Sequence, residues 1–232
     1  MKRAHKFLKN VSFSLLSRIW HVLLALFLSP YIVRKLGVEM YGVLTIIGTI
    51  SGYFALANFG MTNTLVKFIS EYKAKKKYEV IKNLISTGFS FYLLIGIVGA
   101  ILIIFIIPII AEIVFIIPKG YNAIFSQALQ LSGVSFFLTM VINFFISVIK
   151  GFQRFEFLII KSVVFYTIYQ VGVVILLWFG FGIIEIVFLQ ILTSILTLIS
   201  YFFIIKIVND GLKICPKFHK DTFLKLFNFS KW

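Results

Sequence analysis

Long apolar runs separated by short polar stretches dominate this chain and set its expected architecture. Six of the runs are close to, or longer than, the roughly 20 residues with which an α-helix crosses the hydrocarbon core of a bilayer. Apolar residues within each run are continuous rather than alternating, which indicates helices and not the strands of a membrane barrel. The sequence therefore predicts an all-α membrane protein, a six-transmembrane-helix bundle with spans at residues 11–33, 41–59, 84–107, 123–149, 157–179 and 183–207.

A seventh apolar patch, residues 109–117, lies between Pro108 and Pro118 and contains Glu112. It is too short to span the membrane independently. We interpret it as the outer end of the third helix, kinked at Pro108, or as an interfacial segment.

The chain becomes polar after the sixth span and turns apolar again at residues 223–229. We expect residues 1–208 to form a six-helix transmembrane lobe. Residues 209–232 are interpreted as a cytoplasmic linker and the start of a second lobe that is cut short. Because six is an even number of crossings, a second copy of the lobe would start on the same side of the membrane, as in parallel repeats.

Composition supports a membrane location, since 60% of the residues are hydrophobic and the mean hydropathy is +1.03, whereas soluble domains are about 45–50% apolar. The net charge of +15 would fit a nucleic-acid partner, but the cations lie between the apolar runs and not along one soluble face. We therefore expect no nucleic acid. The single cysteine excludes an intrachain disulfide framework.

The distribution of Lys and Arg predicts the orientation, because cytoplasmic loops carry an excess of these residues. Of the 23 Lys and Arg residues, 19 fall in the N-terminal segment, the second connection, the fourth connection or the C-terminal tail. Only Arg34, Lys35 and Lys119 fall on the other side, and Arg18 lies within the first span. Both termini are therefore expected to be cytoplasmic.

Several predicted spans carry polar residues at helical spacing, which lipid-facing helices do not need. These stripes fit either hydrogen bonds between helices or a wet cavity. We favour a cavity because long polar side chains lie on these faces. The cavity candidates are Arg18, His21, Asn143, Gln170 and Gln190.

Arg18 is well inside the first span, where an arginine costs on the order of a few kcal/mol unless it is paired, hydrated or snorkelling. Snorkelling to the headgroups is therefore the alternative to a binding role. His21 lies one turn further along and is expected to form hydrogen bonds. Lys150, Arg154 and Lys161 are expected at the cytoplasmic mouth, with Lys161 the stronger candidate for snorkelling.

Gly48 and Gly52 form a small-x-x-x-small pair, which is typical of close helix packing. Asn58 and Gly60 lie where the second apolar run breaks, and we expect a hinge or a packing role for them. Enzyme signatures are missing: the sequence has no Walker loop, zinc-protease motif or nucleophile elbow. We expect no metal site and no cofactor.

Three local patterns resemble the polysaccharide flippases, the lipid-linked oligosaccharide branch of the multidrug/oligosaccharidyl-lipid/polysaccharide exporter superfamily. The turn at residues 36–42 matches their LG-x-x-x-YG pattern, and Asn58-Phe59-Gly60-Met61 matches their D-F-G-L break with an amide in place of the carboxylate. Residues 151–155 match their G-x-Q-R-F connection, and the Ser17-Arg18 region is also similar.

The resemblance implies a flippase that moves an isoprenoid pyrophosphate oligosaccharide across the cytoplasmic membrane by alternating access. The implied partners are this lipid-linked substrate, membrane lipids and a second six-helix half. An ion-coupled multidrug exporter of the same superfamily is one alternative, although it would require a carboxylate in mid-span. A membrane enzyme acting on lipid-linked sugars is another, and it would require acidic or histidine groups at the membrane face.

Overall fold

The computed structural model describes residues 2–55, 60–114, 120–208 and 215–230. These residues form helices joined by short connections, and no strand occurs among them. The helices are α1 (Lys2–Leu36), α2 (Val38–Ala55), α3 (Met61–Ala74), α4 (Tyr78–Ile101), the π-helical turn η2 (Leu102–Ile106), α5 (Ile107–Val114), α6 (Asn122–Gly151), α7 (Phe155–Trp178), α8 (Ile183–Val208) and α9 (Lys220–Ser230).

Glycines with positive φ end or begin helices where the sequence predicts turns. Gly37 has φ +82° and separates α1 from α2. Gly60 has φ +72° and is the N-cap of α3, so the predicted break after the second apolar run is confirmed at this residue. Only glycine adopts such angles without strain. Asn58, the other residue predicted at the break, lies outside the described residues.

The third apolar run is continuous but not regular. After α4, the π-helical turn η2 leads directly into α5, which contains Pro108. Proline has no backbone N–H to donate to the preceding turn, and local widening of the helix is one way to accommodate it. The irregularity therefore lies where the sequence predicts a kink.

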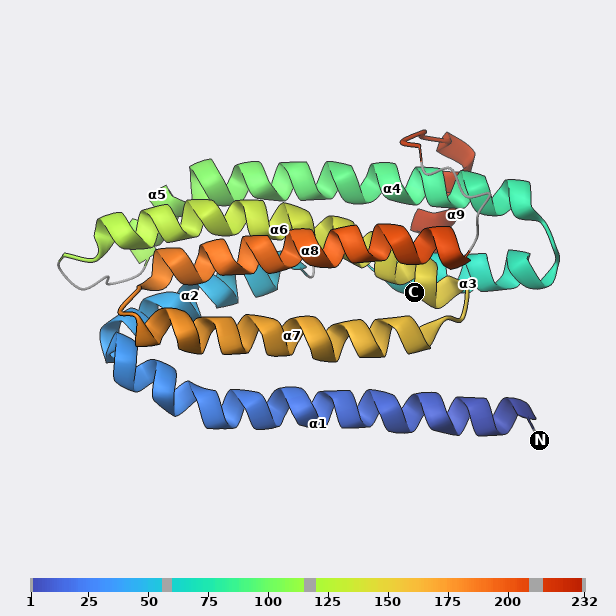
Figure 1. The fold of residues 1–232 in the computed structure, drawn as a ribbon. Helices are drawn as coiled ribbons and strands as arrows, with labels where there is room; N and C mark the ends of the chain where they lie inside the picture. Colours follow the sequence, from blue (N-terminus) through green and yellow to red (C-terminus); the bar gives the residue numbers. More distant parts are fainter. Residues whose placement is uncertain (1, 56–59, 115–119, 209–214, 231–232) are drawn as a thin grey trace.

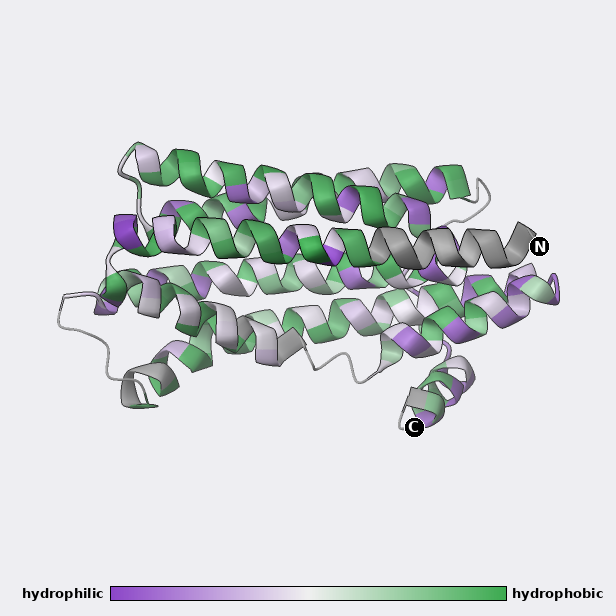
Figure 2. Ribbon diagram, turned by 90° about the horizontal axis from the view of Figure 1, so that it is seen from below, coloured by the Kyte–Doolittle hydropathy of each residue, from purple (hydrophilic) through white to green (hydrophobic). Residues whose placement is uncertain are grey.

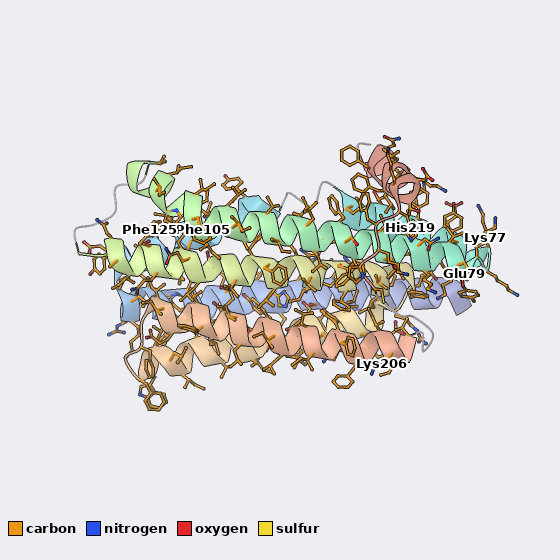
Figure 3. The ribbon with its side chains drawn as sticks, turned by 90° about the horizontal axis from the view of Figure 1, so that it is seen from above. Lys77, Glu79, Phe105, Phe125, Lys206 and His219 are labelled. Atoms are coloured by element: carbon orange, nitrogen blue, oxygen red, sulfur yellow. The ribbon has the colours of Figure 1, made fainter. Side chains whose placement is uncertain are left out.

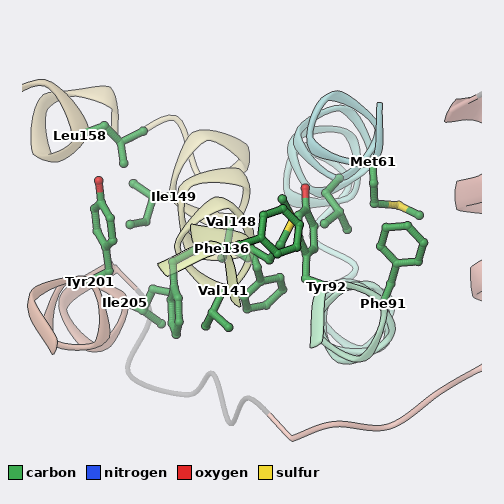
Figure 4. Packing of buried hydrophobic residues seen from close by; sticks show 14 of the residues in the cluster. Met61, Phe91, Tyr92, Phe136, Val141, Val148, Ile149, Leu158, Tyr201 and Ile205 are labelled. Atoms are coloured by element: carbon green, nitrogen blue, oxygen red, sulfur yellow. The ribbon is translucent and has the colours of Figure 1, made fainter. Parts of the chain in front are cut away.

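Helix α6 is the centre of the bundle (Figure 1) and packs against α2, α3, α4 and α8. Figure 4 shows its side chains, among them Val148 and Ile149, between Tyr201 of α8 on one side and Tyr92 of α4 on the other. Helix α1 lies at the edge of the bundle and contacts mainly α7 and α2. In the most apolar stretch of α6, 61% of the residues are buried in the bundle, whereas in that of α1 only 6% are buried.

Close approach of α4 and α6 depends on glycine. A Cβ on Gly99 would lie 2.3 Å from Phe136 Cε1, and one on Gly133 would lie 2.6 Å from Ile104 Cγ1. By contrast, a Cβ on Gly48 or Gly52 would meet no atom within 4 Å. The close packing predicted for these two α2 glycines is therefore not made within the described chain.

Five described helical segments are long and apolar enough to cross a membrane: residues 15–36, 78–110, 122–151, 155–178 and 183–208. The remaining predicted span corresponds to α2, whose apolar part, Val38–Ile50, is shorter. These segments confirm a multi-pass helical bundle. A sixth crossing by α2, continued beyond Ala55, stays a prediction.

One end of the bundle, here called the basic end, holds the N-terminus, the α3–α4 turn, the α6–α7 connection and α9 (Figure 1). Lys77 and Lys206 both lie at this end, opposite Phe105 and Phe125 (Figure 3). Figure 2 shows hydrophobic residues along the lengths of the helices and hydrophilic ones at the α3–α4 turn and in α9. The fold thus brings together the segments in which the sequence concentrates its cations.

Candidate functional site

Polar and aromatic contacts join α1 to α7. Trp20 donates a hydrogen bond from Nε1 to Thr167 Oγ1 at 2.9 Å. One residue further along α1, the ring centroid of His21 lies 4.2 Å from that of Tyr166, and His21 Nε2 is 3.4 Å from Ser162 Oγ. Hydrogen bonds of this kind between spans contribute on average about 0.6 kcal/mol each. They fix the rotation of α1 against α7.

A pocket of about 250 Å³ opens beside these contacts, between α1, the end of α6 and the start of α7. Its polar lining comes from Arg18 and His21 of α1, Lys150 of α6 and Ser162 of α7. The remaining lining residues are Ser17, Phe155, Leu158 and Ile159. The fold therefore gathers three of the residues singled out in the sequence, Arg18, His21 and Lys150, around one space.

The lining has two cations and no acidic residue, so the electrostatic potential in the pocket favours an anion. Arg18 is exposed, whereas Ser17 beside it is only 8% exposed. An arginine presents a planar fork that can hold two phosphate oxygens, and a lysine adds a compact charge. The hydroxyl of Ser162 and the ring of His21 can complete the coordination of phosphate or sugar oxygens.

Lys150 is positioned by the way α6 ends. Ser70 of α3 donates from Oγ to the carbonyl oxygen of Gly151 at 3.0 Å, and Lys73 donates from Nζ to the carbonyl oxygen of Phe152 at 2.8 Å. These contacts satisfy carbonyls that the end of a helix leaves without partners. Helix α3 thereby holds the last turn of α6, and Lys150 with it.

Gly151 begins the G-x-Q-R-F pattern but does not itself form the turn. Gly151 is still helical, and the positive φ of the connection belongs to Gln153, at +60°. A Cβ on Gly151 would lie 2.7 Å from Ile69 Cβ. The glycine is therefore needed for the close approach of α3 to α6, and not for the turn itself.

The other predicted site residues lie outside this pocket. Gln170 of α7 is 8% exposed, and its Nε2 lies 3.4 Å from Tyr166 OH. Arg154 forms an exposed ion pair with Glu156 at 3.2 Å, and Lys161 lies over the ring of Phe165 at 4.9 Å. Asn143 and Gln190 are half-buried on α6 and α8. The pocket thus contains only part of the predicted cavity.

The polar stripe of α6 is mostly packed into the core. Ser132 and Ser147 are buried, and their hydroxyls donate to the carbonyls of Leu129 and Asn143 on the same helix. Such back-bonding satisfies a buried serine hydroxyl within its own helix, and the Ser147 hydroxyl also lies 3.5 Å from Tyr92 OH of α4. For these two serines the structure therefore replaces the expected cavity with local hydrogen bonds.

Aromatic and aliphatic residues of the pocket, such as Phe155 and Leu158, were not singled out from the sequence. They lie in an apolar run in which nothing distinguishes them from lipid-facing neighbours. Ser17 is distinguished in the sequence only by a family resemblance, and its burial next to Arg18 follows from the packing of α1 on α7.

Acidic residues with described side chains lie in the first or last turns of helices. Glu39, Glu79, Glu156, Glu185 and Asp221 are in first turns, where the helix dipole favours a negative charge. Glu71 lies near the end of α3 and pairs with Lys75. Among these described residues none supplies a carboxylate in the middle of a span.

The helices and their apolar surfaces define a multi-pass helical membrane protein with a cationic pocket near its basic end. The family described as "Polysaccharide biosynthesis protein" matches residues 7–232, so the chain belongs to this family. This match confirms the resemblance to polysaccharide flippases that the turn and connection patterns indicate. Neither the curated proteins nor the solved structures compared with the chain include a match to it.

Proposed function

We propose that this chain forms one lobe of a flippase that moves a lipid-linked oligosaccharide across the cytoplasmic membrane for surface polysaccharide synthesis. The substrate would be an isoprenoid pyrophosphate glycan, which has an anionic head, many hydroxyl groups and an apolar tail. Family membership supports a role in polysaccharide biosynthesis.

The proposal rests on one observation. Arg18 and Lys150 are 132 positions apart in sequence, yet they line the same pocket, and its lining contains no acidic residue. A pyrophosphate keeps its charge wherever the head group moves, so it must be stabilised by cations during the crossing. Arg18 would contact the phosphate oxygens, and Lys150 would attract the head at the mouth. His21 and Ser162 would accept or donate hydrogen bonds to the head group.

Alternating access would require a second lobe opposite the first. We propose a second six-helix unit as that partner, rocking against this one about the substrate. Support comes from the middle of α2, where the exposed residues Thr45, Gly48, Thr49 and Gly52 are small or hydroxyl-bearing, unlike the large aliphatic and aromatic residues that α8 exposes. Small residues of this kind suit a helix–helix or aqueous contact better than a lipid surface.

Replacement of Arg18 tests the proposed substrate contact. Charge-assisted hydrogen bonds contribute about 1.5–3 kcal/mol, so Arg18→Ala should lower export about tenfold or more. Arg18→Lys should restore part of the activity because the charge remains and only the fork is lost. The measurement is surface glycan per unit of membrane-inserted protein, in flippase-deficient cells that carry the complete protein.

Arg34→Ala is the matched control, because Arg34 is an exposed arginine at the other end of the same helix. It should leave export nearly unchanged. If Arg18→Ala exports as well as the parent protein, Arg18 is a snorkelling residue and the proposed head-group site is wrong.

A further inference from the structure

A second polar pocket lies at the basic end, away from Arg18. It has a volume of about 300 Å³ and lies between the first turns of α4 and the segment that precedes α9. One face of α4 contributes Glu79, Lys82, Asn83 and Ser86, and the opposite wall consists of Cys215, Lys217 and His219. Glu79 and His219 are both at the same end of the bundle as Lys77 (Figure 3).

The walls of this pocket are held in place by α9. His219 donates its backbone N–H to Thr87 Oγ1 at 3.4 Å, which ties the incoming segment to α4. The tilted rings of Phe223 and Phe218 are in contact, with centroids 5.0 Å apart, and Leu226 is fully buried. The pocket is therefore built from packed elements on both sides.

Cation–aromatic contacts hold α9 against α3. The ammonium of Lys67 lies 3.4 Å from the centroid of the Phe229 ring, and Lys225 lies over the rings of Phe68 and Tyr72. Lys225 also donates a hydrogen bond to the hydroxyl of Tyr72. Each such contact is worth about 0.5–1 kcal/mol at an exposed site. Together they fix the wall that carries Lys217.

The charges of the pocket are unbalanced. Lys82 and Lys217 face one carboxylate, that of Glu79, so the lining has one positive charge in excess when His219 is neutral. Among the described residues the ion pairs are Glu71–Lys75 and Arg154–Glu156, so the Glu79 carboxylate neutralises neither lysine directly. Asn83 and Ser86 add an amide and a hydroxyl. Ammonium, amide and hydroxyl groups are donors that bind phosphate oxygens.

The position of the pocket indicates where the phosphate comes from. Tyr78, one turn before Lys82 on α4, is 57% exposed, and tyrosine is enriched where a membrane meets water. The exposed lysines 75–77 lie in the adjoining turn. Basic segments next to a membrane attract anionic lipids by about 1 kcal/mol per lysine. A phosphodiester with a single negative charge matches the single positive charge in excess.

We propose that this pocket is a phosphate-binding site that takes the head group of an anionic phospholipid and so clamps the segment before α9 onto α4. A soluble phosphate offers the same chemistry, and the test separates the two sources. The site is distinct from the Arg18 pocket, so its test does not depend on transport.

Cys215 provides the measurement, because it is the only cysteine of the chain and it is an exposed lining residue of the pocket. The purified protein is reconstituted in phosphatidylcholine alone, in phosphatidylcholine with phosphatidylglycerol, and in phosphatidylcholine with inorganic phosphate. The rate of alkylation of Cys215 by a neutral maleimide is then compared. A bound lipid head group should slow the reaction about fivefold or more in phosphatidylglycerol only.

Protection by inorganic phosphate without phosphatidylglycerol would assign the site to a soluble phosphate. Protection by neither would overturn the proposal. Lys82→Gln/Lys217→Gln should abolish protection, whereas Lys76→Gln/Lys77→Gln, which removes the same charge from the neighbouring turn, should retain most of it. Equal loss in both double variants would mean that only the general surface potential acts, and the proposal would be wrong.

Discussion

Helices α6 and α1 carry similar polar stripes, yet they use them differently. The serines of α6 at positions 132, 135 and 147 are buried, and two of their hydroxyls donate to carbonyls of their own helix. The larger polar residues of α1 reach another helix, as in the contacts of Trp20 with Thr167 and of His21 with Ser162, whereas Ser29 donates to its own helix. Arg18, on the same helix, lines a pocket.

The difference shows that a polar stripe does not define a cavity by itself. Small hydroxyls can be satisfied locally and so tolerate a tightly packed position. The polar groups of arginine and histidine cannot be satisfied by carbonyls of their own helix. These side chains therefore lie against another helix or in an open pocket. The helical spacing of polar residues shows only that they share a face of the helix. The size and charge of their side chains indicate whether that face lines a functional pocket.

The largest expected effect is on the packing of α6. In Gly133→Ala the new Cβ would lie 2.6 Å from Ile104 Cγ1 and 3.1 Å from the carbonyl oxygen of Ala100, and the backbone atom cannot move aside easily. Overpacking of this kind costs about 1–3 kcal/mol. We expect a clear loss of thermal stability in detergent and a lower level of inserted protein.

Gly48→Ala is the matched control on the exposed face of α2, where a Cβ meets no atom of the described chain. Alanine also favours the helix by about 1 kcal/mol over glycine. We expect unchanged or higher stability of the isolated chain. Equal destabilisation by the two substitutions would contradict the distinction between the packed core and the open α2 face.

A smaller effect is expected for the buried hydroxyl of Tyr92, which links three helices. Tyr92 OH lies 2.7 Å from Thr62 Oγ1 and 3.5 Å from Ser147 Oγ. Tyr92→Phe should lower the free energy of unfolding by about 1 kcal/mol. Ser135→Ala should be neutral or slightly stabilising, because the buried Ser135 hydroxyl has no hydrogen-bond partner among the described residues. A stability series in detergent would show the opposite order if the α6 serines formed the main polar network.

The smallest expected effect concerns the surface of α3. The hydrogen bond from Lys75 lowers the pKa of Glu71, and Glu71 in turn raises the pKa of Lys75. The carboxylate contribution to stability is thus present above the ordinary pKa of Glu and is lost as the pH falls through the lowered value. Because the pair is exposed, Glu71→Gln should cause no resolvable change in the melting temperature at neutral pH. A marked shift would mean that this end of α3 is covered.

Much of the fold follows from the sequence, because continuous apolar runs of sufficient length form helices in a bilayer. The break at Gly60 and the irregularity near Pro108 follow from the backbone chemistry of these two residues. The sequence does not show which helices pack against one another. Helical periodicity tells which residues share a face, but it does not tell whether α1 pairs with α7 or with α6.

The candidate site shows the same limit. Arg18 and Lys150 could be picked out because cations near the middle or mouth of a span are costly. Their meeting in one pocket depends on the pairing of α1 with α7 and on the contacts of α3 that fix the end of α6. The expected packing role of Gly48 rests on residue type and spacing alone. The structure assigns the close approach to Gly151, and it leaves Gly48 exposed.

The central claim is that the α1–α7 pocket is hydrated and cationic, while the α6 stripe is dry. Thiol labelling in a Cys215→Ser background tests it most directly. Ser162→Cys should react about tenfold faster with an anionic methanethiosulfonate reagent than with a cationic one, and Arg18→Ala, which leaves Lys150 in the lining, should weaken this preference. Ser147→Cys should react with neither reagent. Equal rates with the two reagents at position 162, or rapid labelling at position 147, would contradict the account.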